Sequence, residues 1–110
     1  MSLTQTGRAV QHINESQFDR EVLQSAGPVL VDFYADWCGP CKLLTPVLEE
    51  LARETPDAKI VKVNVDDAPG IANRYGVNSI PTLIVFRDGQ AKTGMVGLAS
   101  KTRLRSLLAR

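Results

Sequence analysis

The 110-residue chain is poor in the residues that build metal centres and disulfide frameworks. It has two cysteines, Cys38 and Cys41, and a single histidine, His12. A structural zinc site takes about four protein ligands, so one chain has too few of them, and a cluster shared between two subunits is the alternative that remains. Pro40, between the cysteines, stiffens the turn against such ligation.

The sequence also lacks an excess of either charge and lacks long apolar runs. It has 13 Lys and Arg against 12 Asp and Glu, without blocks of like charge, so nucleic acid and anionic membranes are poor candidate partners. The longest apolar runs, such as TLIVF at 82–86, are far shorter than the about 20 residues that cross a bilayer. The leader MSLTQTGRAV has no apolar core of the secretory type. We therefore expect a soluble, cytoplasmic protein.

Length and apolar content together are typical of one compact domain. With 44% apolar residues, a chain of this size buries enough surface to fold without a disulfide staple. Internal repeats, low-complexity tracts and linker-like shifts in composition are absent from the sequence. We predict a flexible leader over 1–7 and a single domain over 8–110, and we expect a monomer because the sequence has no long uncapped apolar stripe.

The first elements follow from capping residues and hydrophobic spacing. We expect a strand at 8–12, followed by a helix that Asn14 caps with Gln17 three residues later. Apolar residues at helical spacing continue this helix, and Gly27, followed by a proline, ends it.

The centre of the chain predicts a strand, a helix and a second strand. Segments 28–35 and 58–65 are apolar on both faces, which is typical of central strands covered on both sides. Between them, a helix is expected from Cys38 to about Glu54, with a kink at Pro46. Elements in this order predict a parallel pair of strands with a right-handed crossover.

The remaining segments complete a mixed sheet. A short helix is expected at 69–75, and TLIVFRDGQAKTGMVG (82–97) predicts an antiparallel hairpin that turns at Asp88 and Gly89. Ser100 caps a last helix whose leucines face the core. The predicted fold is α/β, with a mixed central sheet of about five strands flanked by about four helices.

The spacing of the two cysteines favours reversible redox chemistry over a structural staple. A disulfide that closes a four-residue loop removes only about 2 kcal/mol of chain entropy. Helical residues three apart have Cα atoms about 5 Å apart, which a disulfide tolerates. Cys38 lies where a strand gives way to a helix, so free N–H groups and the helix dipole favour its thiolate and make it the nucleophile. Cys41, one turn deeper, suits the resolving thiol.

Two charged residues interrupt the central strands. Asp32 lies inside VLVDFYA, and Lys62 is the charged residue inside IVKVNV on the next predicted strand. Burial raises the pKa of a carboxyl, whereas a nearby ammonium lowers it. We expect the two to pair and Asp32 to exchange a proton with Cys41 near neutral pH. A solvated, unimportant Asp32 near the strand end is the alternative.

The sequence resembles the thioredoxin family from about His12 onward. VDFYADWCGPCK (31–42) is similar to the family signature almost residue for residue, and this run is far more specific than a bare CxxC pair. KVNVDDAPGIANRYGV (62–77), SIPTLIVFRDG (79–89) and a later VG resemble the second half of the family in order and spacing. The departures are small: Tyr34 stands where many members carry a second tryptophan, and Ser79 stands where glycine is frequent.

The resemblance implies a protein disulfide reductase and electron carrier. It implies Cys38 as the attacking thiol, Cys41 as the resolving thiol, and Asp32 with Lys62 as the buried pair that manages protons. It implies no bound cofactor, with electrons coming from NADPH through a thioredoxin reductase. The other implied partners are proteins that contain disulfides.

The resemblance further implies a docking surface beside the cysteines. The Ile80–Pro81 peptide bond is expected to be cis and to face the disulfide, leaving the Ile80 backbone to pair with an extended substrate segment. Gly97 has the alternative interpretation of a simple turn residue. The implied apolar rim consists of Trp37, Gly39, Pro40, Ile80, Pro81 and Gly97.

Other functions compete with the reductase. A disulfide oxidase or isomerase often carries a histidine between its cysteines, and Gly39 and Pro40 favour the reductant instead. A glutaredoxin would call for a different dipeptide and a glutathione pocket. A binding module that docks a partner on its apolar rim is the alternative from another class, because a fold does not fix a function.

Overall fold

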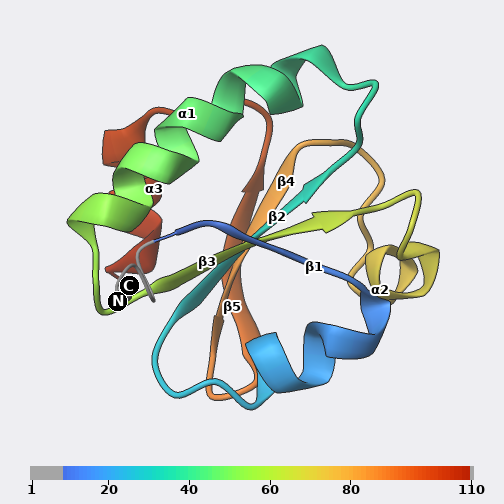
Figure 1. Cartoon of the computed structure of the whole chain (residues 1–110), viewed down its shortest axis with the longest axis horizontal. Helices are drawn as coiled ribbons and strands as arrows, with labels where there is room; N and C mark the ends of the chain where they lie inside the picture. Colours follow the sequence, from blue (N-terminus) through green and yellow to red (C-terminus); the bar gives the residue numbers. More distant parts are fainter. Residues whose placement is uncertain (1–8, 110) are drawn as a thin grey trace, which may run out of the picture.

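The computed structural model describes residues 9–109, which form a five-stranded mixed sheet covered by helical segments on both faces (Figure 1). The strands run in the order β1-β3-β2-β4-β5; β1, β3 and β2 are parallel, while β4 and β5 continue the sheet antiparallel. The predicted parallel pair and hairpin are both confirmed. The strands are Gln11–Ile13 (β1), Val29–Tyr34 (β2), Lys59–Asn64 (β3), Thr82–Arg87 (β4) and Gln90–Val96 (β5).

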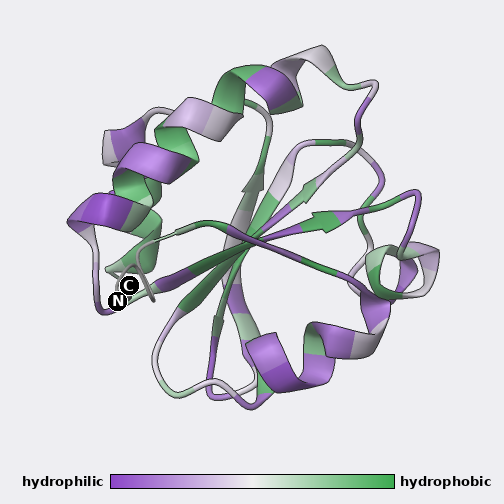
Figure 2. Ribbon diagram, viewed as in Figure 1, coloured by the Kyte–Doolittle hydropathy of each residue, from purple (hydrophilic) through white to green (hydrophobic). Residues whose placement is uncertain are grey.

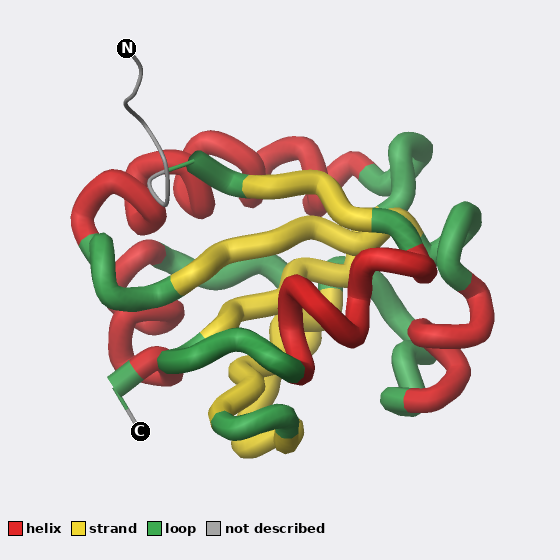
Figure 3. The backbone as a smooth tube through the Cα atoms, turned by 60° about the horizontal axis from the view of Figure 1, so that its bottom comes forward, coloured by secondary structure: helices red, strands yellow, loops and turns green. Residues whose placement is uncertain are grey.

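Within residues 9–109, three α-helices and one irregular helical segment cover the sheet in two layers. The α-helices are Gly39–Glu54 (α1), Pro69–Arg74 (α2) and Lys101–Leu108 (α3). Figure 3 shows the strands side by side, with helical segments on both sides of them. Helix α1 continues across Pro46, and Ser100 caps α3 as predicted by accepting from the backbone N–H of Arg103.

The alternation of side chains along each strand builds a separate core on each face. Leu30, Ile60 and Leu83 pack with leucines of α1 and α3, whereas Val31, Phe33 and their neighbours pack with Phe18, Val22 and α2. In Figure 2 the central strands are largely hydrophobic and the helices carry hydrophobic and hydrophilic residues by turns.

The first helical segment is not the continuous helix that the spacing predicted. A 3₁₀ turn at Glu15–Gln17 (η1) passes into a π-helical turn at Asp19–Leu23 (η2). The capping box between Asn14 and Gln17 is present, and it closes the tight first turn. Apolar spacing does not distinguish these helix types, because Phe18 and the residues after it reach the core in each. The predicted strand at 8–12 also shifts to β1, and its first residue lies outside the described residues, as does the leader.

Contacts between α1 and α3 and the turn between β4 and β5 complete the fold. Near the C-terminal end of α1, Glu54 accepts hydrogen bonds from Lys101 and Arg105 of α3. Strand β5 forms one edge of the sheet, and its pairing with β4 is irregular between Val85 and Phe86, next to the turn. Asp88 and Gly89 have positive φ angles in that turn, as the Asp-Gly sequence predicts.

Phe18 should carry much of the stability of the layer that contains α2. Its ring is 1% exposed and lies 5.7 Å from the rings of both Tyr75 and Phe86. We expect Phe18→Ala to lower the free energy of unfolding by about 3–5 kcal/mol in urea titrations. Leu43→Ala is the control, because Leu43 is 64% exposed, and it should change stability by less than about 0.5 kcal/mol. Equal losses in the two variants would contradict this assignment of the core.

Candidate redox site

The two cysteines lie where the chain passes from β2 into α1. Cys38 is the N-cap residue of α1, and Cys41 lies in its first turn. The two sulfurs form a disulfide, with Cα atoms 5.3 Å apart. The backbone N–H of Cys41 points to Cys38 Sγ at 3.2 Å. That donor and the positive end of the helix are placed to stabilise a Cys38 thiolate once the disulfide is reduced.

Both cysteines are buried in the disulfide form. Cys38 is 5% exposed and Cys41 is 2% exposed. Cys38 is thus more exposed than Cys41, as expected, but the difference in exposed fraction is small. The hydrophobic side chains that pack with them are Tyr34, Ala35, Val65 and Ile80.

A loop from the second half of the chain lies against the cysteines. The Ile80–Pro81 peptide bond is cis, as the resemblance implied. The carbonyl oxygen of Ile80 lies 3.9 Å from Cys38 Sγ. Gly97, at the end of β5, donates its backbone N–H to the Pro81 carbonyl at 2.8 Å and has a φ of 103°, which favours glycine. The fold therefore brings Gly97 to the cis-proline loop.

The residues of the implied rim differ in exposure. Trp37 is 70% exposed, with its indole N–H donating to Asp66 at 2.9 Å, and Gly39 and Pro40 are exposed beside it. Pro81 is buried, so it can shape the surface only through its neighbours. This burial follows from its position at the start of central strand β4, where it precedes Thr82 directly.

Two exposed apolar residues next to this loop were not among the rim residues predicted from the sequence. Val96 is 61% exposed and Leu98 is 51% exposed, and they flank Gly97. Their signal was weak, because single apolar residues at the end of an edge strand are common on protein surfaces.

Asp32 is the buried acid of the site. Its side chain is 0% exposed, and neither carboxyl oxygen has a hydrogen-bond partner. Burial raises the pKa of Asp32 from 3.8 to about 7, while the charge of Lys62 opposes that rise. The interpretation of Asp32 as a solvated residue at the strand end is therefore wrong.

The expected direct pairing of Lys62 with Asp32 is not what the structure contains. The two residues are register partners on adjacent parallel strands, and Lys62 is 6% exposed. However, the Lys62 ammonium donates to the Thr45 hydroxyl at 3.0 Å and lies 4.4 Å from the centre of the Tyr34 ring. These partners on α1 and β2 hold the ammonium, so its charge acts on Asp32 through space.

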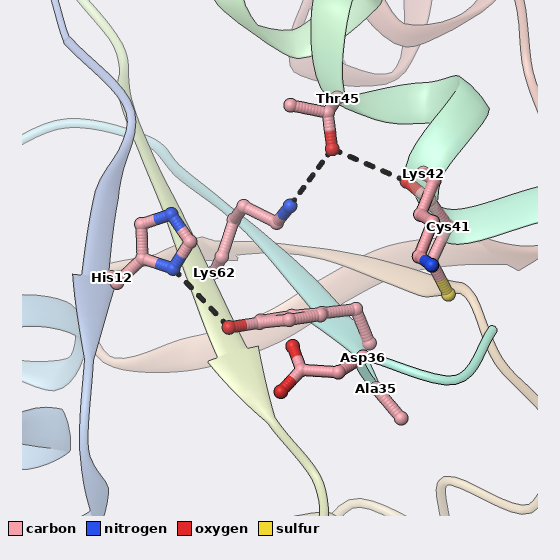
Figure 4. A pocket seen from close by; sticks show the side chains of 8 residues that line it. His12, Ala35, Asp36, Cys41, Lys42, Thr45 and Lys62 are labelled. Carbon is pink, nitrogen blue, oxygen red and sulfur yellow. Dashed lines mark hydrogen bonds between the residues drawn. The ribbon is translucent and has the colours of Figure 1, made fainter. Parts of the chain in front are cut away.

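A pocket of about 300 Å³ opens beside these groups (Figure 4). His12 enters it from β1, and its Nδ1 lies 3.2 Å from the Tyr34 hydroxyl. Burial is the main cause that raises the pKa of Tyr34. Cys41 forms part of the wall, so the pocket connects the resolving cysteine with the ammonium of Lys62. The lining residues are His12, Tyr34, Ala35, Asp36, Cys41, Lys42, Thr45 and Lys62.

Comparison with known proteins identifies the architecture around this site. The family model described as Thioredoxin matches residues 9–110. The chain belongs to the thioredoxin family. It is 48% identical over 97 residues to Thioredoxin 1 of Synechococcus elongatus, covering 87% of this chain and 91% of that protein. It is 46% identical over 98 residues to the chloroplastic Thioredoxin M-type of Spinacia oleracea, covering 88% of this chain and 54% of that protein.

A solved structure is also similar. A mutant thioredoxin from Halobacterium salinarum NRC-1 superposes with a TM-score of 0.86 at 39% sequence identity, covering 96% of this chain and 93% of that one. The thioredoxin-like fold predicted from the sequence is thereby confirmed. As a thioredoxin with a Cys-x-x-Cys pair, the chain is a thiol–disulfide oxidoreductase that exchanges dithiols and disulfides.

Thioredoxins act on disulfide-containing targets and generally bind no cofactor. Within residues 9–109, the structure has no group of three or more His, Cys, Asp and Glu side chains placed to hold a metal ion. In the same part of the chain, no helix has the length and apolar character needed to cross a membrane.

The buried acid makes stability depend on pH. An unfolded chain loses the Asp32 proton near pH 3.8, whereas the folded protein keeps it up to about pH 7. The folded state therefore binds more protons between these values, and the free energy of unfolding falls as the pH rises through them. Asp32→Asn should remove this loss, making the oxidised variant more stable than wild type above about pH 7, by about 4 kcal/mol at most.

Urea titrations of the oxidised proteins between about pH 4 and pH 9 measure this effect without titrating thiols. Asp57→Asn is the control, because Asp57 is exposed, and it should leave the wild-type pH dependence in place. A parallel pH dependence in wild type and Asp32→Asn would contradict the raised pKa.

Proposed function

We propose that this thioredoxin is a protein disulfide reductase and electron carrier in which Cys38 attacks the target and Cys41 resolves the mixed disulfide. The observation that carries the proposal is the position of Cys38 at the N-cap of α1, with the Cys41 N–H directed at its sulfur. This donor stabilises a thiolate at Cys38, whereas Cys41 is deeper in the helix and follows as the second nucleophile.

The proposed reaction passes two electrons to the target. The Cys38 thiolate attacks one sulfur of the target disulfide, forming a mixed disulfide, and the other target sulfur leaves and takes up a proton. Cys41 then loses its proton and attacks Cys38 Sγ. This step closes the Cys38–Cys41 bond, breaks the mixed disulfide and releases the second target sulfur, which takes up a proton as well.

Asp32 is the proposed acceptor of the Cys41 proton. Its pKa of about 7 allows it to accept and return a proton near neutral pH. It lies on the sheet face that α1 covers, sharing that face with Leu30, and Cys41 is a buried residue of α1. Lys62 tunes Asp32 through space, because its charge favours the carboxylate.

The proposed docking surface is the apolar rim around the cysteines. Trp37, Gly39 and Pro40 supply exposed surface on one side of the disulfide, and Ile80 with Gly97 supplies the other. An extended target segment pairs with the Ile80 backbone, whose carbonyl lies beside Cys38. Pro81 contributes by fixing this loop, since its own side chain is buried.

The residues between the cysteines support the reducing direction. Gly39 and Pro40 carry no charge, so they do not add the stabilisation of the thiolate that makes related oxidases strong oxidants. We propose that electrons come from NADPH through a thioredoxin reductase, and that the protein works as a monomer in the cytoplasm. A reducing compartment suits this role because it keeps the dithiol reduced between turnovers.

Insulin reduction with dithiothreitol as electron source tests the roles of the cysteines. Cys38→Ser should abolish the catalysed rate, because the attacking thiolate is missing and the remaining Cys41 is buried. Cys41→Ser should turn over more slowly, and when it is reduced beforehand and mixed with insulin in the absence of dithiothreitol, it should accumulate a mixed disulfide with the target, seen as a mass adduct, because no second thiol resolves it. Adduct formation by Cys38→Ser instead of Cys41→Ser would reverse the assignment.

Equilibration of the dithiol with glutathione buffers tests the direction. The proposed reductant should stay oxidised until the buffer is strongly reducing, near the potential of about −270 mV that is typical of a reducing thioredoxin. A potential near about −120 mV would favour the oxidase. In a separate test in cells, a Cys38→Ser variant that still performs the cellular role of the protein would favour the binding module.

Asp32→Asn tests the proton-transfer role. The amide cannot accept a proton, so insulin turnover should fall about tenfold or more between about pH 6 and pH 9. Asp57→Asn, a like change at an exposed site, should turn over as wild type. A wild-type rate for Asp32→Asn across this range would refute the role of Asp32.

A further inference from the structure

The position of the Lys62 ammonium needs an explanation, because a direct partner is close at hand. Asp32 and Lys62 are register partners on neighbouring parallel strands, which lie about 4.8 Å apart. Their side chains share the sheet face that α1 covers, yet neither Asp32 oxygen receives a hydrogen bond. Some other contact must direct the lysine away from the carboxyl group.

Thr45 provides that contact. Its hydroxyl accepts a hydrogen bond from Lys62 Nζ at 3.0 Å and donates to the backbone carbonyl of Cys41 at 3.3 Å (Figure 4). Because Thr45 follows Cys41 by four residues, both lie on one side of α1. The hydroxyl thus links the ammonium of the sheet to the helical turn that holds the resolving cysteine.

The Tyr34 ring supports the ammonium from the strand side. The centre of the ring lies 4.4 Å from Lys62 Nζ, a distance at which the ring face attracts a cation. The Tyr34 hydroxyl is itself 3.2 Å from Nδ1 of His12, the register partner of Lys62 on β1. Helix and ring together hold the ammonium without a hydrogen bond to the carboxyl group.

The placement of this charge has a chemical consequence. An ammonium in direct contact with a carboxylate lowers the pKa of the carboxyl by about 1–3 units. Here burial has the larger effect, and the pKa of Asp32 is raised to about 7. A hydroxyl that keeps Lys62 at a distance therefore preserves Asp32 as an acid that exchanges protons near neutral pH.

We propose that Thr45 is a positioning residue for the proton-transfer step, because its hydroxyl holds the Lys62 ammonium against α1 and off the Asp32 carboxylate. This inference rests on the proposed function, in which Asp32 accepts the proton of Cys41. Neither the cysteine motif nor the hydrophobic pattern of α1 gave Thr45 a role. The titratable or charged groups around the ammonium are His12 from β1, Asp32 and Tyr34 from β2, Asp36 from the following loop, and Cys41 and Lys42 from α1.

The test measures the titration midpoint of Asp32 directly, from the pH dependence of its side-chain carboxyl carbon shift in NMR. The oxidised protein is used, so Cys41 does not titrate. Thr45→Val keeps the shape but removes the hydroxyl, and the freed ammonium should turn to Asp32 and lower its midpoint by about one pH unit or more. Thr45→Ser keeps the hydroxyl and should titrate as wild type. Thr45→Ala repeats the test without a β-branched side chain.

Two further variants separate this effect from a general change of packing. Thr55→Val is the matched control, because Thr55 also donates to a carbonyl four residues back in the chain, that of Leu51 in α1, at 2.6 Å. It should leave the Asp32 midpoint unchanged. In a Lys62→Met background, Thr45→Val should no longer lower the midpoint, because the cation that causes the shift is gone.

An unchanged midpoint in Thr45→Val, a shift of equal size in Thr45→Ser, or a shift that persists without Lys62 would each overturn the proposal. The midpoint is read in the oxidised protein without substrate. A negative result in this titration would therefore overturn only the role of Thr45. A failure of the proposed reductase function would instead appear as a change in insulin turnover.

Discussion

The buried carboxyl group of Asp32 is the constraint to which the rest of the site is fitted. A carboxylate without hydrogen-bond partners is costly to bury, and Asp32 is fully buried on the sheet face where the leucines of α1 and α3 pack. The same helix α1 carries Cys38 and Cys41 at its N-terminal end. One packing interface, between α1 and the sheet, therefore sets both the acidity of the buried group and the position of the sulfurs.

Much of this arrangement could be predicted from the sequence, because it depends on local signals. The capping box at Asn14, the Asp-Gly turn and the N-cap position of Cys38 each follow from residues within a few positions of one another. The buried acid was also predictable, since a charge inside an apolar strand has few other interpretations.

The parts that could not be predicted depend on contacts between distant segments. The 3₁₀ and π turns before β2 share their apolar spacing with an ordinary helix. The direction of the Lys62 side chain was not predictable either: a pair of opposite charges suggested a direct contact, whereas a hydroxyl and an aromatic ring hold the ammonium instead. A long, flexible side chain can reach several partners, and the folded structure determines which of them lie close to it.

The exposed edge of the sheet at β5 affects which part of this protein can pair with a target strand. Strand β5 exposes one edge of the sheet, carries Lys92 in its exposed part, and pairs unevenly with β4 near the turn. Breaks in pairing and charged side chains make an edge a poor template for further strands. Because the proposed targets present an extended segment, an edge that pairs poorly leaves the Ile80 loop beside the sulfurs as the favoured place for that segment to pair.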